Sequence, residues 1–376
     1  MRRAITWQLW ALLWSGAAFA GTAIKPSLSL TAEERYDDDA LLRGTTGPLG
    51  AELMTKLTPR LGLGLRGRTY DAEGWYASDF QFRHLSKSFH LDHRGGLQLH
   101  KRLSPQDSVL ARLQLWAVSD PTSLPRMGMG RTLAPVVYGT GELGYDSALT
   151  RRWLLNARYA FEGAYFFDGL TPPGAVHAPS LDLWYRATRR ASVGVGYRFQ
   201  HFLFGQAQGI AHSPTAMFRY RLSPFTTFTA RGGPAWFQSS QAEGIAPRVH
   251  VELARDARGL EMGFQLGQDL AGASGYTLAL WAQYAGGYVG WRLSERLRIF
   301  GGTFGFRNGT APGGPSEWFG GMSEYGYAVS GGLEWRFDRR LMLQLQVDRI
   351  EQMVGAEALG TFARNIAALR LVMTAW

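Results

Sequence analysis

The sequence predicts an all-β fold: a transmembrane, antiparallel, up-and-down β-barrel of about 18 strands. Three observations lead to this prediction. The chain begins with an export signal, its body alternates apolar and polar residues with a period of two, and short turns alternate with long loops along its length.

The first 20 residues are typical of a cleaved signal peptide. Arg2 and Arg3 provide a positive start, an apolar stretch follows over 4–18, and Ala18-Phe19-Ala20 matches the small-residue pattern of a cleavage site. We therefore expect residues 1–20 to be removed and residues 21–376 to form one outer-membrane barrel domain.

Apolar and polar residues alternate along the body of the chain. The clearest segment places apolar residues on one face and polar residues on the other, with Leu341, Leu343, Leu345 and Val347 opposed to Gln344, Gln346 and Asp348. Such alternation indicates strands whose two faces meet different surroundings. No segment after residue 25 shows a convincing helical period.

The connections between these segments differ in length and predict the strand number. Eight short turns, among them Leu57-Thr58-Pro59-Arg60, alternate with nine longer stretches rich in Gly, Pro and Ser, among them 73–90. Within that stretch we expect residues 76–86 to extend above the membrane. Strict alternation of short and long connections with an even strand number is typical of outer-membrane barrels, and these connections join 18 strands.

Composition narrows the function classes. The chain has no cysteine, which excludes disulfide scaffolds, thiol nucleophiles and iron–sulfur sites. Its 40 basic residues exceed the 30 acidic ones, yet the arginines are spread through the strands, so we expect no nucleic-acid partner. A soluble sandwich or propeller is the alternative fold, but neither requires alternating connection lengths, and no blade motif repeats.

In a barrel of this kind the polar faces line the lumen. This assigns to the lumen twelve arginines, Arg66, Arg68, Arg112, Arg158, Arg186, Arg198, Arg219, Arg221, Arg231, Arg248, Arg298 and Arg336. Eight carboxylates accompany them, Glu52, Glu142, Glu162, Asp182, Glu252, Glu261, Glu334 and Asp348, as do Trp116 and Trp184. The positive excess favours anionic solutes, whereas pairing of these charges within the wall is the alternative role.

The remaining candidates concern assembly and metals. The terminal Trp376 fits the aromatic residue by which the barrel-assembly machinery recognises many outer-membrane barrels. His90-x-x-His93 lacks a nearby acidic partner, and Asp37-Asp38-Asp39 is expected to be a solvated loop, so we predict no metal site. No G-x-S-x-G elbow or Ser/His/Asp arrangement indicates an enzyme, and no cofactor is expected.

The mature N-terminus resembles a family of outer-membrane porins associated with exopolysaccharide production. The resemblance lies in Pro26-Ser27-Leu28-Ser29-Leu30, in Tyr36-Asp37-Asp38-Asp39, and in the Arg-Leu-Ser turns at 102–104, 221–223 and 292–294. It implies a barrel that passes a secreted polysaccharide across the outer membrane, together with a periplasmic polysaccharide-export protein and an inner-membrane copolymerase.

Three functions follow from the sequence. The leading expectation is an exopolysaccharide conduit in the outer membrane of a Gram-negative bacterium. The second is a porin for diffusion of small solutes, including anions. The third is a barrel with a closed lumen that acts as a structural surface protein, in contact with outer-membrane lipids like the other two.

Overall fold

The computed structural model describes residues 22–38, 50–119, 134–205, 207–240, 243–257, 259–271, 280–310, 324–354 and 361–375. The predicted signal peptide at 1–20 and the predicted assembly signal Trp376 lie outside these residues. No helix in this part of the chain is long and apolar enough to cross a membrane.

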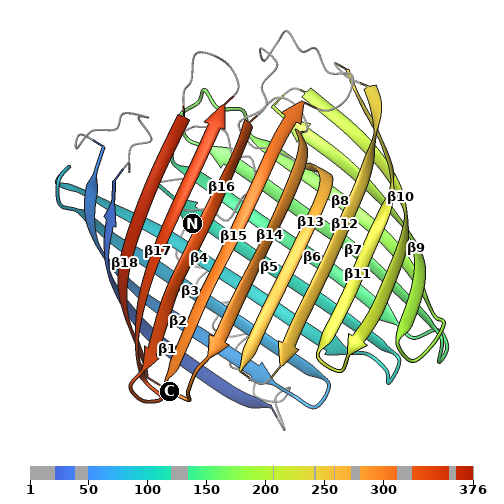
Figure 1. Cartoon of the computed structure of the whole chain (residues 1–376), viewed down its shortest axis with the longest axis horizontal. Helices are drawn as coiled ribbons and strands as arrows, with labels where there is room; N and C mark the ends of the chain where they lie inside the picture. Colours follow the sequence, from blue (N-terminus) through green and yellow to red (C-terminus); the bar gives the residue numbers. More distant parts are fainter. Residues whose placement is uncertain are drawn as a thin grey trace, which may run out of the picture.

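Eighteen antiparallel strands make up the described chain (Figure 1). They are β1 (Ala23–Asp37), β2 (Glu52–Arg66), β3 (Tyr70–Arg83), β4 (Ser88–Arg102), β5 (Asp107–Val118), β6 (Val136–Ser147), β7 (Trp153–Phe166), β8 (Gly174–Arg186), β9 (Ala191–Phe204), β10 (Ala207–Ser223), β11 (Thr226–Ser239), β12 (Glu243–Ala257), β13 (Leu260–Ala271), β14 (Leu280–Arg292), β15 (Leu297–Thr310), β16 (Glu324–Arg336), β17 (Leu341–Val354) and β18 (Thr361–Thr374).

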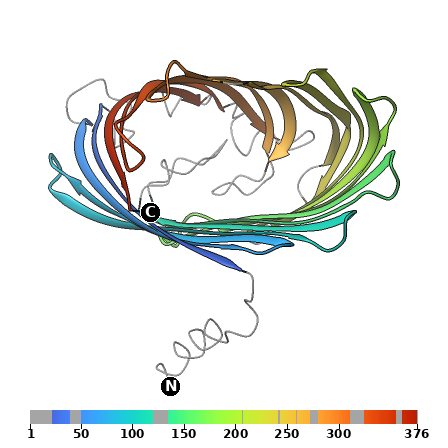
Figure 2. The ribbon, with the colours of Figure 1, turned by 90° about the horizontal axis from the view of Figure 1, so that it is seen from below.

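The sheet closes on itself. Each strand pairs with its neighbours in sequence, and β1 pairs with both β2 and β18, so no strand edge is left unpaired. Closure gives every strand a partner on both sides, which hydrocarbon surroundings require. Viewed along its axis, the barrel encloses a lumen that is much wider in one direction than in the other (Figure 2).

Two predicted connections near the start of the chain are wrong, although the strand number is confirmed. The segment at 57–60 lies inside β2, and the actual turn follows at 67–69, where the Gly67 amide donates to the Tyr70 carbonyl over 2.9 Å. The stretch 73–90 is a hairpin of β3 and β4 with its tip at 84–87, not an extension above the membrane. The predicted positions of one turn and one loop were wrong, but no connection was added or lost, so the strand number is still 18.

Pro59 explains the misplaced turn. Its ring removes the backbone donor, and the pairing of β2 with β3 passes directly from Leu57 to Arg60. On the other side the pairing with β1 continues without a break, with Pro59 opposite Leu30. A proline that interrupts one ladder therefore sits inside a continuous strand.

The alternation along the strands separates an apolar outer face from a polar inner face. Large apolar side chains such as Leu61, Val195 and Val347 are 60%, 63% and 55% exposed on the outer face. Exposure of this kind around a closed wall is what contact with lipid requires. The period-two prediction for 341–348 is confirmed.

The seam between β1 and β18 is held by buried charges. Asp37, at the end of β1, is fully buried and accepts hydrogen bonds from the Arg364 guanidinium of β18, and Arg35 approaches it at 3.1 Å. Asp38 accepts a bond from the Asn365 amide over 2.6 Å. Two residues that were predicted to lie in a solvated acidic loop therefore bond to β18 and stabilise the closure of the barrel.

Candidate functional site

Contacts between strands that are not neighbours identify the face that lines the lumen. Arg198 on β9 pairs with Asp269 on β13 at 3.0 Å, and Arg231 on β11 pairs with Asp182 on β8 at 3.1 Å. Side chains on the convex side of a closed sheet diverge, so these pairs form on the inside. Together with the register of the strands, these pairs show which strand positions face the lumen and which face outward.

The register places eleven of the twelve predicted arginines on strand positions that face the lumen. The exception is Arg68, which lies in the turn between β2 and β3 rather than in a strand. Arg186, Arg221 and Arg336 lie at or near strand ends beside the short turns. The predicted carboxylate Glu252 lies opposite Thr229 and Gln265 on the same inner face.

Most of these arginines are neutralised by carboxylates in the wall. Ion pairs join Arg66 to Asp71, Arg112 and Arg158 to Glu142, Arg158 to Asp146, Arg198 and Arg248 to Asp269, Arg231 to Asp182, and Arg298 to Glu261 and Glu334. The positive excess counted in the sequence is therefore distributed over a largely paired surface.

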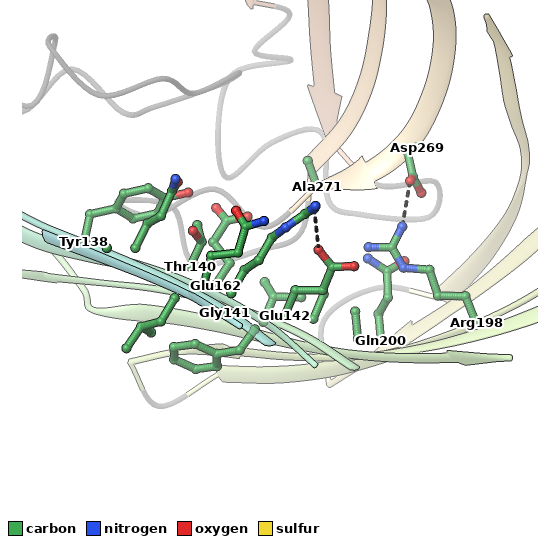
Figure 3. Close-up of a pocket in the computed structure, with 18 of the residues that line it drawn as sticks. Tyr138, Thr140, Gly141, Glu142, Glu162, Arg198, Gln200, Asp269 and Ala271 are labelled. Atoms are coloured by element: carbon green, nitrogen blue, oxygen red, sulfur yellow. Dashed lines mark hydrogen bonds and ion pairs between the residues drawn. The ribbon is translucent and has the colours of Figure 1, made fainter. Parts of the chain in front are cut away.

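A chamber of about 1060 Å³ occupies the lumen. One wall comes from β3 to β9 and carries Arg112, Thr140, Glu142 and Glu162, and the facing wall comes from β13 to β15 (Figure 3). Polar and charged side chains from both walls line it, as expected of a water-filled passage.

Asp269 narrows this passage. Its two carboxylate oxygens form ion pairs with Arg198 and Arg248, each at 3.0 Å, so that one acid from β13 joins β9 and β12. Beside it, the buried Gln200 side chain donates to the Leu270 carbonyl over 3.3 Å. In Figure 3 Arg198 and Asp269 point toward each other from the two walls.

An apolar cluster reinforces the narrowing. Leu270 belongs to a buried apolar cluster with six residues from four other strands, Val176, Phe202, Phe204, Ala211, Ala235 and Phe237. The end of β13 is thereby anchored to the opposite wall by both ionic and apolar contacts.

Neither Asp269 nor Gln200 was among the predicted site residues. β13 runs to Ala271, and Asp269 continues the polar face of Gln265 along the strand. The alternation of Gln265, Gly267 and Asp269 is the signal that would have extended the strand.

The two predicted lumen tryptophans have different surroundings. Trp184 is 3% exposed, and the Arg219 guanidinium lies 4.7 Å from its ring centroid, with Arg231 at 5.9 Å. Trp116 stacks on Tyr138 at 5.2 Å and packs against an apolar cluster on β5 to β7. Both rings are occupied by protein contacts.

The histidine pair of the sequence does not form a site. His90 and His93 are three residues apart on β4 and so point to opposite faces, and the His93 ring bonds with the Tyr76 hydroxyl at 2.6 Å on the outer face. Among the described residues no group of three His, Asp or Glu side chains is arranged to hold a metal ion.

Comparison with known proteins shows similarity in fold but not in sequence. No protein-family model and no curated protein sequence matches the chain. Among solved structures it is similar to Acinetobacter baumannii OccAB4, at 10% identity over 93% of this chain and 98% of that chain, with a TM-score of 0.50. It also resembles Pseudomonas aeruginosa OpdK with vanillate, at 12% identity over 94% and 99% with a TM-score of 0.49, and OprD from the same organism, at 10% identity over 93% and 94% with a TM-score of 0.47.

The likeness to OccAB4 concerns the fold, a closed 18-stranded outer-membrane barrel. Together with the apolar outer face, it places this chain in the outer membrane of a Gram-negative bacterium.

Proposed function

We propose that the chain is a porin through which small hydrophilic solutes diffuse across the outer membrane. The observation that carries this proposal is the charged chamber inside a closed barrel, narrowed by the Asp269 contacts. A polar passage with a local constriction suits molecules of limited size.

Ion pairing sets the expected selectivity. Because seven of the predicted arginines have carboxylate partners, the lumen offers little unbalanced positive charge over most of its length. We therefore expect only a weak preference for anions, and passage of neutral solutes as well.

The resemblance at the N-terminus leads to a different expectation, an exopolysaccharide conduit. The contacts between β9 and β13 argue against it, because they cross the passage that a hydrated polymer would need. Two residues that carry the resemblance, Asp37 and Asp38, bond to β18 instead of facing a solute.

Two measurements test the proposal. The purified full chain in a planar lipid bilayer should give stable ion-conducting steps, and a strain lacking the gene should take up a small hydrophilic dye or antibiotic more slowly. The same strain should release normal amounts of polysaccharide.

Lost polysaccharide with unchanged permeability would contradict the porin proposal. It would support the export conduit, with a periplasmic polysaccharide-export protein and an inner-membrane copolymerase as the partners to seek. A bilayer without conductance, from a chain shown to be folded, would instead support a closed structural barrel.

A further inference from the structure

A strip of aromatic side chains runs along the inner wall on two neighbouring strands. Its members lie on the lumen face of β14 and β15 and are Tyr284, Tyr288, Phe300, Phe304 and Phe306. Tyr288 lies opposite Gly302, and Tyr284 lies opposite Phe306, so rings from the two strands interleave. From Phe300 to Phe306 the strip extends about 20 Å at the rise of a strand.

Each ring of this aromatic strip lies over a glycine of an adjacent strand. The pairs of glycine and ring are Gly332 with Phe300, Gly263 with Tyr288, Gly286 with Phe304, Gly267 with Tyr284, and Gly326 with Phe306. A methyl group on any of these five glycines would lie less than 3.0 Å from a ring atom of its aromatic partner. The rings therefore pack close to the wall because the positions beneath them carry no side chain.

The rings of the strip lie side by side along the inner wall, and Tyr288 is 57% exposed there. Tyr284 and Phe304 have centroids 6.4 Å apart and planes inclined by 21°, and Phe304 and Phe306 are 6.4 Å apart with planes inclined by 27°. Rings at this separation and inclination lie beside one another in nearly parallel planes. Tyr284, Phe304 and Phe306 therefore form a continuous apolar surface.

A recess opens on the strip between two of its rings. It has a volume of about 310 Å³, is bordered by Tyr288 and Phe304, and has Glu252, Gln265 and Ser330 at its edge. This volume is at the lower end of small-molecule sites, roughly 300–1,000 Å³. Ring faces are thus combined with oxygen and amide groups that accept or donate hydrogen bonds.

We infer that the aromatic strip binds the sugar rings of neutral oligosaccharides as they pass through the lumen. A pyranose ring has an apolar C–H face that packs on an aromatic ring and hydroxyl groups around its edge that need polar partners. Glu252, Gln265 and Ser330 are such partners. A strip of five rings, rather than one pocket, fits a chain of rings better than a single planar molecule.

The charged residues beside the strip suit a neutral ligand. The chamber that shares Phe304 with the strip is lined by two arginines and three carboxylates, Arg112, Arg198, Glu142, Glu162 and Asp269, and by the amides of Gln98 and Gln114. Such a lining provides donors and acceptors in similar number and does not select one sign of charge. The inference rests on the proposed porin function and names its solute class.

The test measures binding by calorimetry to the full chain, folded in detergent, with maltohexaose as the probe. The variant Tyr284→Leu, Tyr288→Leu, Phe304→Leu keeps the apolar bulk of three side chains and removes their flat faces. The triple variant should bind maltohexaose at least about tenfold more weakly, because it loses the binding free energy contributed by three aromatic rings. The matched control is Phe80→Leu on the lipid face of β3, away from the strip and its recess, which should leave binding unchanged.

A polyethylene glycol of the same hydrodynamic size, added to the native chain, serves as a second probe that needs no variant. It should give no saturable binding heat, because it has no ring faces. Equal binding of the glycol and the saccharide, or unchanged binding by the folded triple variant, would overturn the inference.

The two proposals fail in different ways. Calorimetry does not require conduction, so saccharide binding by a chain that conducts no ions would contradict the porin and retain the strip. Ion conduction without saturable maltohexaose binding would contradict the strip and retain the porin.

Discussion

At the residue scale, the charges inside this barrel are mostly structural partners of one another. Asp37 is enclosed by the seam, and Asp269 holds two arginines of different strands. A buried charge separated from its partner is costly, so single substitutions at these acids should have effects well beyond those at exposed positions.

Asp37→Ala should destabilise the barrel by about 3 kcal/mol or more, because the nearly buried Arg364 guanidinium loses its carboxylate. The loss can be measured by urea unfolding of the chain in lipid vesicles. Asp37→Asn, which keeps the size and one acceptor oxygen, should lose less. Equal stability of native chain and Asp37→Ala would show that the seam does not depend on this pair.

Asp269→Ala should widen the passage, since the contacts that join β13 to Arg198 and Arg248 are removed. We expect a higher single-channel conductance and a shift of selectivity toward anions, because two arginines lose their partner. Glu261→Ala, an acid on the lumen face of the same strand that pairs with Arg298, is the control. A conductance equal to that of the control would argue against a constriction at Asp269.

At the element scale, the short turns carry their own stabilising bonds. In the turn between β16 and β17, the Asp338 carboxylate accepts bonds from the Arg340 amide over 2.6 Å and the Leu341 amide over 2.8 Å. These two backbone donors, Arg340 first, hold the pKa of Asp338 below its ordinary value of 3.8. The turn is thus favoured by the ionised carboxylate.

A depressed pKa predicts the pH dependence of this turn. The contribution of Asp338 is fully present above its unfolded pKa and is lost as the pH falls through the lower folded pKa. The protection of the amides at the β16–β17 end against hydrogen exchange, taken relative to the intrinsic rate at each pH, should therefore fall at acid pH in the native chain. In Asp338→Asn the exchange should lack this acid step, and an identical step in both would assign it to another group.

At the scale of the whole molecule, paired charges on the wall set the field along the passage. The triple variant Arg112→Ala, Arg158→Ala, Arg248→Ala leaves Glu142, Asp146 and one oxygen of Asp269 without these arginines. Ion selectivity, measured from reversal potentials in a salt gradient, should shift toward cations.

The control for this variant removes three arginines from short turns, at Arg151, Arg189 and Arg339, where no strand faces the lumen. Its reversal potential should stay close to that of the native chain. Unchanged selectivity in the lumen variant would contradict the assignment of these faces.

The sequence by itself determined the class of fold, the strand number and the two faces of each strand. These follow from local properties: a period of two at 341–348 is read directly from the residues, and alternating connections give 18 strands. The local signal misled at Pro59, because a proline that breaks one ladder looks like a turn until both neighbouring strands are known.

Only the tertiary structure decided which residues meet inside the barrel. Asp269 and Arg198 lie 71 positions apart on strands separated by three others, and closure of the wall brings them together. The aromatic strip likewise depends on register, since Tyr288 has room against the wall only because Gly263 is its neighbour on β13. Alternation specifies a face within one strand, whereas pairing between strands and closure of the sheet specify the site.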